Sequence, residues 1–221
     1  MTRSPGQRAA PSAVLRVGLT GGIATGKSEV GKVFSEEGAF LLDADALGHE
    51  LMMPGTEGYR EIRQAFGEGI LAPDSAIDRG KLGTLVFRDS ASRLRLNEIL
   101  HPLILEEEQR QIREFARRSP PGGIAVTQAA LLVEAGVHES YDRLVVTHCS
   151  PETQIRRLLV RDGLSEDEAA SRIKAQGDPR AKIKLADYLV DTTGSLDATR
   201  DQARRVYEAL RQEWESRRPA G

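Results

Sequence analysis

The residues best suited to chemistry in this 221-residue sequence form a glycine-rich loop of the pattern G-x-x-x-x-G-K-S. Glycines let a backbone wrap closely around a phosphate with its N–H groups aimed inward, and a following helix points its positive end at the anion. The lysine adds a mobile charge for the β- and γ-phosphates, and the serine hydroxyl can ligate Mg²⁺. The pattern predicts a nucleotide site at Gly21, Gly22, Ile23, Ala24, Thr25, Gly26, Lys27 and Ser28.

The neighbouring sequence decides how the loop is interpreted. Residues 14–19 form a short apolar, β-branched run typical of a buried strand, and residues 28–37 carry apolar side chains at helical spacing. A second strand is expected at residues 39–42, which implies a right-handed parallel βαβ unit. A loop between a strand and a helix favours a phosphate site over a glycine turn with an exposed lysine.

An acidic pair, Asp43-Ala44-Asp45, follows the second predicted strand. Ligands of open α/β sheets bind beyond the carboxyl ends of the strands, so this pair should lie beside the phosphate loop. A carboxylate there can accept a proton from an acceptor hydroxyl or hold a Mg²⁺-bound water. A helix N-cap is an equally good explanation for aspartate at this place.

The rest of the sequence predicts an α/β fold with a parallel sheet of about five strands flanked by helices. Further strands are expected at residues 124–127, 144–147 and 188–190. Residues 46–119 have an almost wholly helical pattern and look like an insertion. The predicted breaks in this block are Pro54-Gly55, Gly67 to Pro73, Asp89-Ser90 and His101-Pro102.

Composition limits the classes of function. Hydrophobic residues make up 39% and charged residues 29%, as in ordinary globular proteins, and no apolar run approaches a membrane span. The net charge of −2 provides no general attraction to nucleic acid or to an anionic membrane. We expect a cytoplasmic protein in which Cys149 is a small buried hydrophobe and residues 1–13 are a disordered extension. No N-K-x-D segment is present to read guanine, which favours a kinase over a GTPase.

Several spaced motifs resemble the dephospho-CoA kinase family, and the likeness runs from about residue 14 to residue 207. The resemblance implies transfer of the γ-phosphate of ATP to the ribose 3′-hydroxyl of dephospho-CoA, the last step of coenzyme A synthesis. The matching segments are Val17-Gly18-Leu19-Thr20-Gly21-Gly22-Ile23, Gly26-Lys27-Ser28, Asp43-Ala44-Asp45, Asp78-Arg79, Val86-Phe87, His101-Pro102-Leu103-Ile104, Leu131-Leu132, Glu134, Arg157, Arg161-Asp162, Arg172-Ile173, Gln176 and Ala186-Asp187-Tyr188.

The resemblance also implies a division of the chain. Residues 14–53 and 120–214 would form the nucleotide-binding core of a P-loop NTPase, with a lid at about residues 161–180. Residues 54–119 would form the helical CoA-binding lobe. We expect the protein to bind a small-molecule substrate and neither nucleic acid nor a membrane. We expect it to be a monomer.

Roles for single side chains follow from the same resemblance. Asp45 corresponds to the proposed catalytic base, and Arg161 to a lid arginine that stabilises the transferring phosphoryl group together with Lys27. ATP is the implied co-substrate and Mg²⁺ the implied metal, with Ser28 as its ligand. Glu29 is expected to contact the nucleotide with the loop, although many relatives have threonine there. A carboxylate in the first turn suits the helix dipole but adds negative charge near the phosphates.

Other departures and alternatives concern residues outside the loop. Gln128 replaces an acidic residue found in some relatives, which puts a Mg²⁺-water role there in question. His101 either touches the CoA moiety or caps a helix where His-Pro separates two helices. Arg156 and Arg157 are consistent with a solvated helix face. The rival functions are a nucleoside monophosphate or other small-metabolite kinase, and a nucleotide-binding regulator without catalysis.

Overall fold

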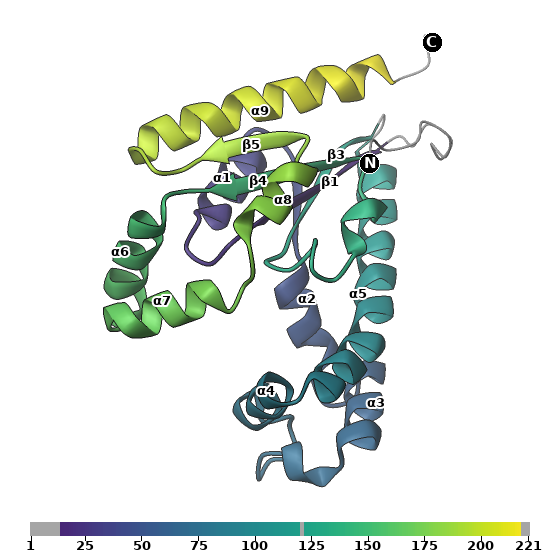
Figure 1. Cartoon of the computed structure of the whole chain (residues 1–221). Coiled ribbons are helices and arrows are strands. Elements are labelled where there is room, and N and C mark those ends of the chain that lie inside the picture. Colours follow the sequence, from purple (N-terminus) through teal and green to yellow (C-terminus); the bar gives the residue numbers. More distant parts are fainter. Residues whose placement is uncertain (1–13, 120–121, 218–221) are drawn as a thin grey trace. The chain divides into compact units, whose positions relative to one another are not determined.

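A parallel sheet forms the centre of the α/β part of the chain, which confirms the predicted fold class (Figure 1). The computed structural model describes residues 14–119 and 122–217, so the extension predicted for residues 1–13 lies outside the described residues. The five strands of this sheet fall where apolar, β-branched runs predict them. They are β1 (Val14–Gly21), β2 (Phe40–Asp43), β3 (Gly123–Gln128), β4 (Arg143–His148) and β5 (Tyr188–Asp191).

Strand β1 lies in the middle of the sheet, whose order is β2-β3-β1-β4-β5. It pairs in parallel with β3 on one side and β4 on the other, and β4 pairs in parallel with β5. Strands β1 and β2 are consecutive in the chain, but β3 lies between them. The connections therefore leave β1 in both directions, and ligands of such sheets bind beyond the carboxyl end of the strand at this reversal.

One face of the sheet packs against two helices, α1 (Lys27–Glu36) and α9 (Leu196–Ser216). Alternate residues of β1 point into this core, because side chains of a strand alternate between its two faces. Helix α9 contributes Ala203, Tyr207 and Leu210 to this core, and each of them is at most 7% exposed. The buried residues of this cluster include Leu15, Val17, Leu19, Val30, Val33, Phe34, Ala203, Tyr207 and Leu210.

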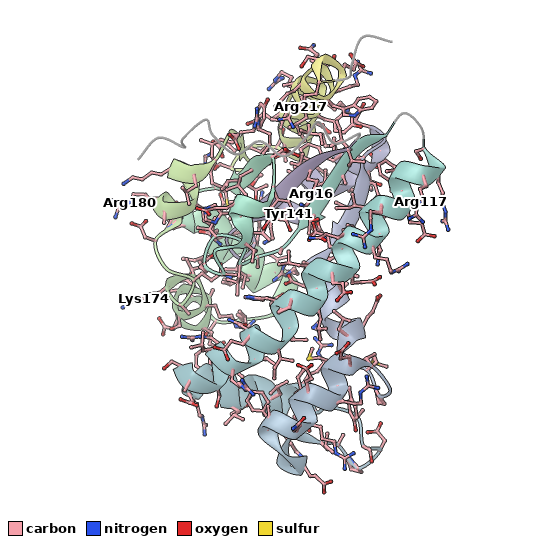
Figure 2. All side chains as sticks on the ribbon, turned by 90° about the vertical axis from the view of Figure 1, so that its right-hand side faces the viewer. Arg16, Arg117, Tyr141, Lys174, Arg180 and Arg217 are labelled. Atoms are coloured by element: carbon pink, nitrogen blue, oxygen red, sulfur yellow. The ribbon has the colours of Figure 1, made fainter. Side chains whose placement is uncertain are left out.

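The other face of the sheet is closed by residues around Tyr141 and by α8 (Pro179–Leu185), which packs against β4. A side chain at Gly18 would begin 3.0 Å from the Tyr141 ring, so glycine allows the ring to approach β1. The Arg16 guanidinium lies 5.5 Å from the centre of the same ring, and the two are neighbours in Figure 2. Such a cation–π contact adds to the packing at the amino end of β1.

Two helices, α6 (Pro151–Asp162) and α7 (Glu166–Lys174), pack side by side after β4 (Figure 1). Ser150 caps α6, whose first residue is a proline, because proline needs no hydrogen-bond partner at that position. Ser165 and Glu168 form a reciprocal capping box at the start of α7. Local hydrogen bonds to the cap residues therefore decide where both helices begin.

The described residues divide into two compact units, one of residues up to Leu42 and from Glu114 onward, the other Asp43–Arg113. The second unit is helical and has its own apolar core. It contains α2 (Ala44–Leu51), α3 (Glu57–Phe66), the 3₁₀ turn Glu68–Ile70, α4 (Arg79–Arg88) and most of α5 (Ser90–Arg118). The buried residues of this core are Tyr59, Ile62, Ile70, Ile77, Leu82, Ile99 and Leu100. Among the helices of the described ranges, none is long and apolar enough to span a membrane.

Helix α5 runs through Pro102, so the predicted break at His101-Pro102 is wrong. A proline inside a helix removes one backbone hydrogen bond and crowds the preceding turn, which the sequence pattern alone treats as a stop. Here Ile99 and Leu100, directly before it, are buried in the helical unit's core. That packing holds the turn together, since tertiary contacts routinely override local propensity.

Candidate active site

The glycine-rich loop leaves the carboxyl end of β1 and enters α1 at Lys27. Gly21 cannot be replaced without a clash, because a Cβ there would meet the Thr147 side chain. Gly26 has φ 83° and Ala24 has φ 57°, so two residues of the loop adopt the left-handed conformation. This region favours glycine, and Ala24 in it costs free energy that other contacts must offset.

The polar side chains of the loop lie where the sequence predicts them. The Lys27 Nζ is half-buried and donates to the carbonyls of Gly21 at 3.0 Å and Gly22 at 3.5 Å. Ser28 is exposed in the first turn of α1. The loop's own carbonyl groups therefore hold the Lys27 side chain against the loop, and the Ser28 hydroxyl is accessible to a ligand.

Four consecutive carbonyl groups of the loop, from Gly22 to Thr25, accept hydrogen bonds from side chains. The Gly22 oxygen accepts from the Thr25 hydroxyl at 2.7 Å, and the Ile23 oxygen accepts from Gln154 Nε2 at 2.8 Å. The Ala24 oxygen accepts from Arg157 Nη1 at 3.0 Å. The Thr25 oxygen accepts from the Thr192 hydroxyl, also at 3.0 Å. Helix α6 and the residue after β5 thus determine the conformation of the loop.

The turn that follows α7 also reaches the loop. The Ile23 N–H donates to Gln176 Oε1 at 2.5 Å, across 153 residues of sequence. Gln176 lies in the segment predicted as a lid, between α7 and the left-handed Gly177. This segment therefore contacts the phosphate loop through a neutral acceptor.

Arg161, the predicted lid arginine, stands in the last turn of α6. Its guanidinium donates two hydrogen bonds to the carboxylate of Asp162, at 2.6 and 2.9 Å, and Arg172 lies 3.7 Å from the same carboxylate. The hydrogen bond from Arg161 holds the pKa of Asp162 below its usual range. The Arg161 side chain is 61% exposed, so this ion pair is a weak one that a phosphate can replace.

The two predicted acids differ in their local roles. Asp43 is the N-cap of α2, and its carboxylate accepts from the Ala46 N–H at 3.0 Å. Asp45 is exposed in the first turn of the same helix, which belongs to the helical unit. The N-cap explanation therefore applies to Asp43, which leaves Asp45 as the candidate base.

Glu29 is neutralised by a residue that sequence reasoning does not single out. Its carboxylate forms an ion pair of 2.6 Å with Arg200 from α9, and both side chains are about one-third exposed or less. The negative charge that Glu29 places next to the loop is thus balanced locally.

The two comparisons with known proteins by sequence agree on one family. Residues 15–198 match the family model described as dephospho-CoA kinase. The chain belongs to the dephospho-CoA kinase family. A dephospho-CoA kinase from Geobacter sulfurreducens is 45% identical over 179 residues, which are 81% of this chain and 90% of the relative. One from Moorella thermoacetica is 40% identical over 88% of this chain and 91% of its own.

Solved structures have the same fold. TT1252 from Thermus thermophilus superposes with a TM-score of 0.74 at 28% identity, covering 89% of this chain and 97% of its own. Dephospho-CoA kinase from Campylobacter jejuni superposes with a TM-score of 0.64 at 24% identity, covering 90% and 98%. Membership of the dephospho-CoA kinase family is thus accompanied by the family's fold over nearly the whole described chain.

Three further residues named from the sequence lie outside the loop of this dephospho-CoA kinase family member. Gln128 ends β3 and pairs with Leu19 in β1. Cys149 follows β4, half-buried, and burial raises the pKa of its thiol, which disfavours a nucleophile. His101 lies inside α5, where burial lowers its pKa. In the described ranges, no three His, Cys, Asp or Glu side chains are grouped so that they could hold a metal ion.

Sequence reasoning missed the contacts of Gln154, Arg157, Thr192 and Gln176 with the loop. Arg157 and Gln176 stand in motifs shared with the family, but nothing in their spacing shows that they bind loop backbone. Arg157, in particular, is not on a solvated helix face, because its guanidinium is half-buried against Ala24 and Thr192. A partial signal is its i, i+3 spacing from Gln154, which puts both on one face of a helix.

Proposed function

We propose that this protein transfers the γ-phosphate of ATP to the ribose 3′-hydroxyl of dephospho-CoA, giving coenzyme A and ADP. The observation that carries the proposal is the match to the dephospho-CoA kinase family over residues 15–198. The shape of the phosphate loop supports it, since the loop is tied at four carbonyls and opens a helix with Lys27 and Ser28 at its start.

The loop binds the phosphates of ATP by its backbone N–H groups and the positive end of α1. Lys27 places a charge at the β- and γ-phosphates, and Glu29 lies in the same first turn of α1 with its charge balanced by Arg200. The exposed Ser28 hydroxyl is a hard oxygen donor that fits Mg²⁺. When bound, this ion neutralises negative charge on the phosphates.

The chemical step requires a base and a second positive charge. Asp45 accepts the proton of the 3′-hydroxyl while the new O–P bond forms and the bond from γ-phosphorus to the bridging oxygen of ADP breaks. Arg161 leaves Asp162 and stabilises the charge on the transferring phosphoryl group. Because the transition state is loose, positioning and charge neutralisation outweigh the strength of the base.

The substrate lobe and the lid complete the proposal. Residues 54–119 hold dephospho-CoA, and residues 161–180 close over the nucleotide held by the core of residues 14–53 and 120–214. A groove of about 610 Å³ runs along α4, and its charged lining residues are Lys81, Arg88, Asp78 and Asp89, so its positive and negative charges balance. A monomeric state and a cytoplasmic location stay predictions from the sequence.

An ADP-release assay with four acceptors tests the proposed function. With ATP and Mg²⁺, dephospho-CoA should be turned over at least about 10²-fold more efficiently than AMP, CMP or shikimate. Preferred turnover of AMP, CMP or shikimate would instead identify another small-metabolite kinase, and ATP binding without turnover of any acceptor would identify a regulator.

Two variants show whether the turnover arises at the loop. Lys27→Ala should lower kcat/KM by about 10²-fold or more, because it removes charge at the transferring group. Lys32→Ala is the matched control, since Lys32 lies in the same helix and forms only an exposed ion pair with Glu36. Activity of Lys27→Ala within a few-fold of the parent would remove the loop from the mechanism.

A further inference from the structure

The guanidinium of Arg157 contacts the phosphate loop directly at one peptide group and the next one through Thr192. Its Nη1 donates to the Ala24 oxygen at 3.0 Å and to the Thr192 hydroxyl at 3.0 Å, while Nη2 donates to the Thr192 oxygen at 2.6 Å. The Thr192 hydroxyl in turn donates to the Thr25 oxygen at 3.0 Å. Arg157 therefore holds one loop carbonyl directly and the next through Thr192.

Gln154 holds the preceding carbonyl, that of Ile23, from one turn earlier in α6. We call Gln154, Arg157 and Thr192 the carbonyl clamp. Gln154 is 8% and Thr192 1% exposed, so their hydrogen bonds are shielded from water. Hydrogen bonds shielded from water are stronger than exposed ones, and the half-buried Arg157 adds a charged donor to these neutral ones.

The clamp has a consequence on the opposite side of the loop. A trans peptide is planar, so the N–H of a residue points away from the carbonyl that precedes it. With the Ile23 and Thr25 oxygens held by the clamp, the N–H groups of Ala24 and Gly26 are directed away from it. N–H groups that converge in this way form an anion-binding concavity.

The loop needs this support because of its backbone conformation. Ala24 has φ 57°, in the left-handed region that a residue with a side chain rarely adopts. A strained conformation persists only where the surroundings over-determine it. The bond from Arg157 to the Ala24 oxygen acts at the strained residue itself.

We propose that Arg157 is a positioning residue: acting with Thr192 through the loop carbonyls, it holds the N–H groups that bind the phosphates of ATP. The proposal rests on the proposed function only in requiring that ATP binds at this loop. Arg157 contributes through the geometry of its two donor nitrogens and not as a direct phosphate ligand, since both nitrogens are engaged by Ala24 and Thr192.

Two conservative variants separate geometry from charge. Arg157→Lys keeps the charge but lacks the planar fork that reaches both acceptors. Thr192→Val keeps the shape of the side chain and leaves Arg157 in place, but it breaks the link to the Thr25 oxygen. We expect KM for ATP to rise about 30-fold in the first variant and about 10-fold in the second, with KM for dephospho-CoA within about twofold of the parent.

The double variant tests whether the two residues act through the same peptide groups. Because they hold one structure together, Arg157→Lys with Thr192→Val should be hardly worse than Arg157→Lys alone. Arg156→Gln is the control, since Arg156 is the exposed neighbour on the same helix. It should leave both KM values unchanged.

Direct binding of ADP, measured by calorimetry, keeps this test separate from the test of the proposed function. Weaker ADP binding in both variants, with parent-like circular dichroism, supports the clamp even if the parent does not phosphorylate dephospho-CoA. A parent-like Arg157→Lys beside a defective Arg157→Gln would show that charge alone matters and overturn the proposal. So would variants that lose thermal stability and kcat while their affinity for ATP and ADP stays unchanged.

Discussion

At the scale of single residues, the acid that ends β2 and the acid in the first turn of α2 differ in their local contacts. The Asp43 carboxylate accepts from the Ala46 N–H, whereas Asp45, two residues further along, is exposed. The sequence pattern fits a base and a cap equally well. The distinction appears only when the first helical residue is known to be Ala44.

This distinction predicts opposite effects of the same substitution at the two acids. Asp45→Asn removes a proton acceptor and a charge, so kcat should fall by about 10²-fold or more while ATP affinity changes little. Asp43→Asn should stay within a few-fold of the parent, because asparagine is as good an N-cap as aspartate. Steady-state kinetics with dephospho-CoA and ATP check both variants. A severe Asp43→Asn beside a mild Asp45→Asn would reverse the assignment.

The pairing of Glu29 with Arg200 predicts a compensated charge beside the nucleotide. Arg200→Ala leaves the Glu29 carboxylate in the first turn of α1 without its 2.6 Å partner, so KM for ATP should rise about threefold to tenfold. Glu29→Thr combined with Arg200→Ala removes both charges and should recover most of the affinity. An Arg200→Ala enzyme with the parent's KM for ATP at low salt would contradict this account.

At the scale of elements, the lid segment combines a short, well-capped helix with few anchors. Helix α7 has one buried residue, Ala169, and most of its other side chains are exposed. Lys174 and Arg180 lie at the outer edge of this region in Figure 2, and the Arg180 side chain is 81% exposed. A segment with so little buried apolar surface opens at low free-energy cost.

We therefore expect the lid to respond to ligands. Hydrogen exchange over residues 164–176 should slow when ATP and a dephospho-CoA analogue are both bound, because phosphate charge attracts Arg161 and closure excludes water. The competing pair with Asp162 is screened by water, because the Arg161 side chain is 61% exposed, and it is too weak to prevent the exchange of partners. Exchange rates that are the same with and without ligands would identify an ordinary surface helix.

Kinetics of Arg161→Ala complete this prediction. The variant should lower kcat more than it weakens dephospho-CoA affinity, because the charge that Arg161 stabilises develops on the transferring group. Arg180→Ala is the control, because Arg180 lies on the same segment and pairs with Asp178. Equal losses of kcat in Arg161→Ala and Arg180→Ala would mean that the total positive charge of the segment matters and the position of Arg161 does not.

At the scale of the whole molecule, carboxylates with lowered pKa predict how stability depends on pH. The hydrogen bonds from Arg110 lower the pKa of Glu107 to about 2, with a further contribution from Gln111. A folded-state pKa below the unfolded value of about 4.5 contributes stability that is present above pH 4.5 and lost as the pH falls toward 2.

Urea unfolding measured between pH 5 and pH 2 checks this prediction. In Glu107→Gln the decline of stability over this window should be shallower than in the parent. Glu106→Gln, a change at the exposed neighbour in the same helix, should keep the parent's decline. Identical slopes for the parent and Glu107→Gln would show that other carboxylates, such as Asp162 and Asp191, carry the acid sensitivity.

The sequence by itself determined the features of this protein that depend on neighbours along the chain. The phosphate loop, the apolar strands and the caps at Ser150 and Ser165 each involve residues within one or two turns of each other. Local sterics and hydrogen bonding decide such features, so composition and spacing reveal them. The order of the family motifs along the whole chain predicted the reaction as well.

Only the tertiary structure decided which distant residues complete the site. Arg157 lies 133 residues from Ala24, and Thr192 lies 167 residues from Thr25. These contacts depend on the placement of β1 between β3 and β4, which no local pattern encodes. The unbroken α5 has the same cause, since packing of Ile99 and Leu100 outweighs the local effect of Pro102. Local patterns are read along the chain, whereas burial and long-range hydrogen bonds exist only once the strands have paired.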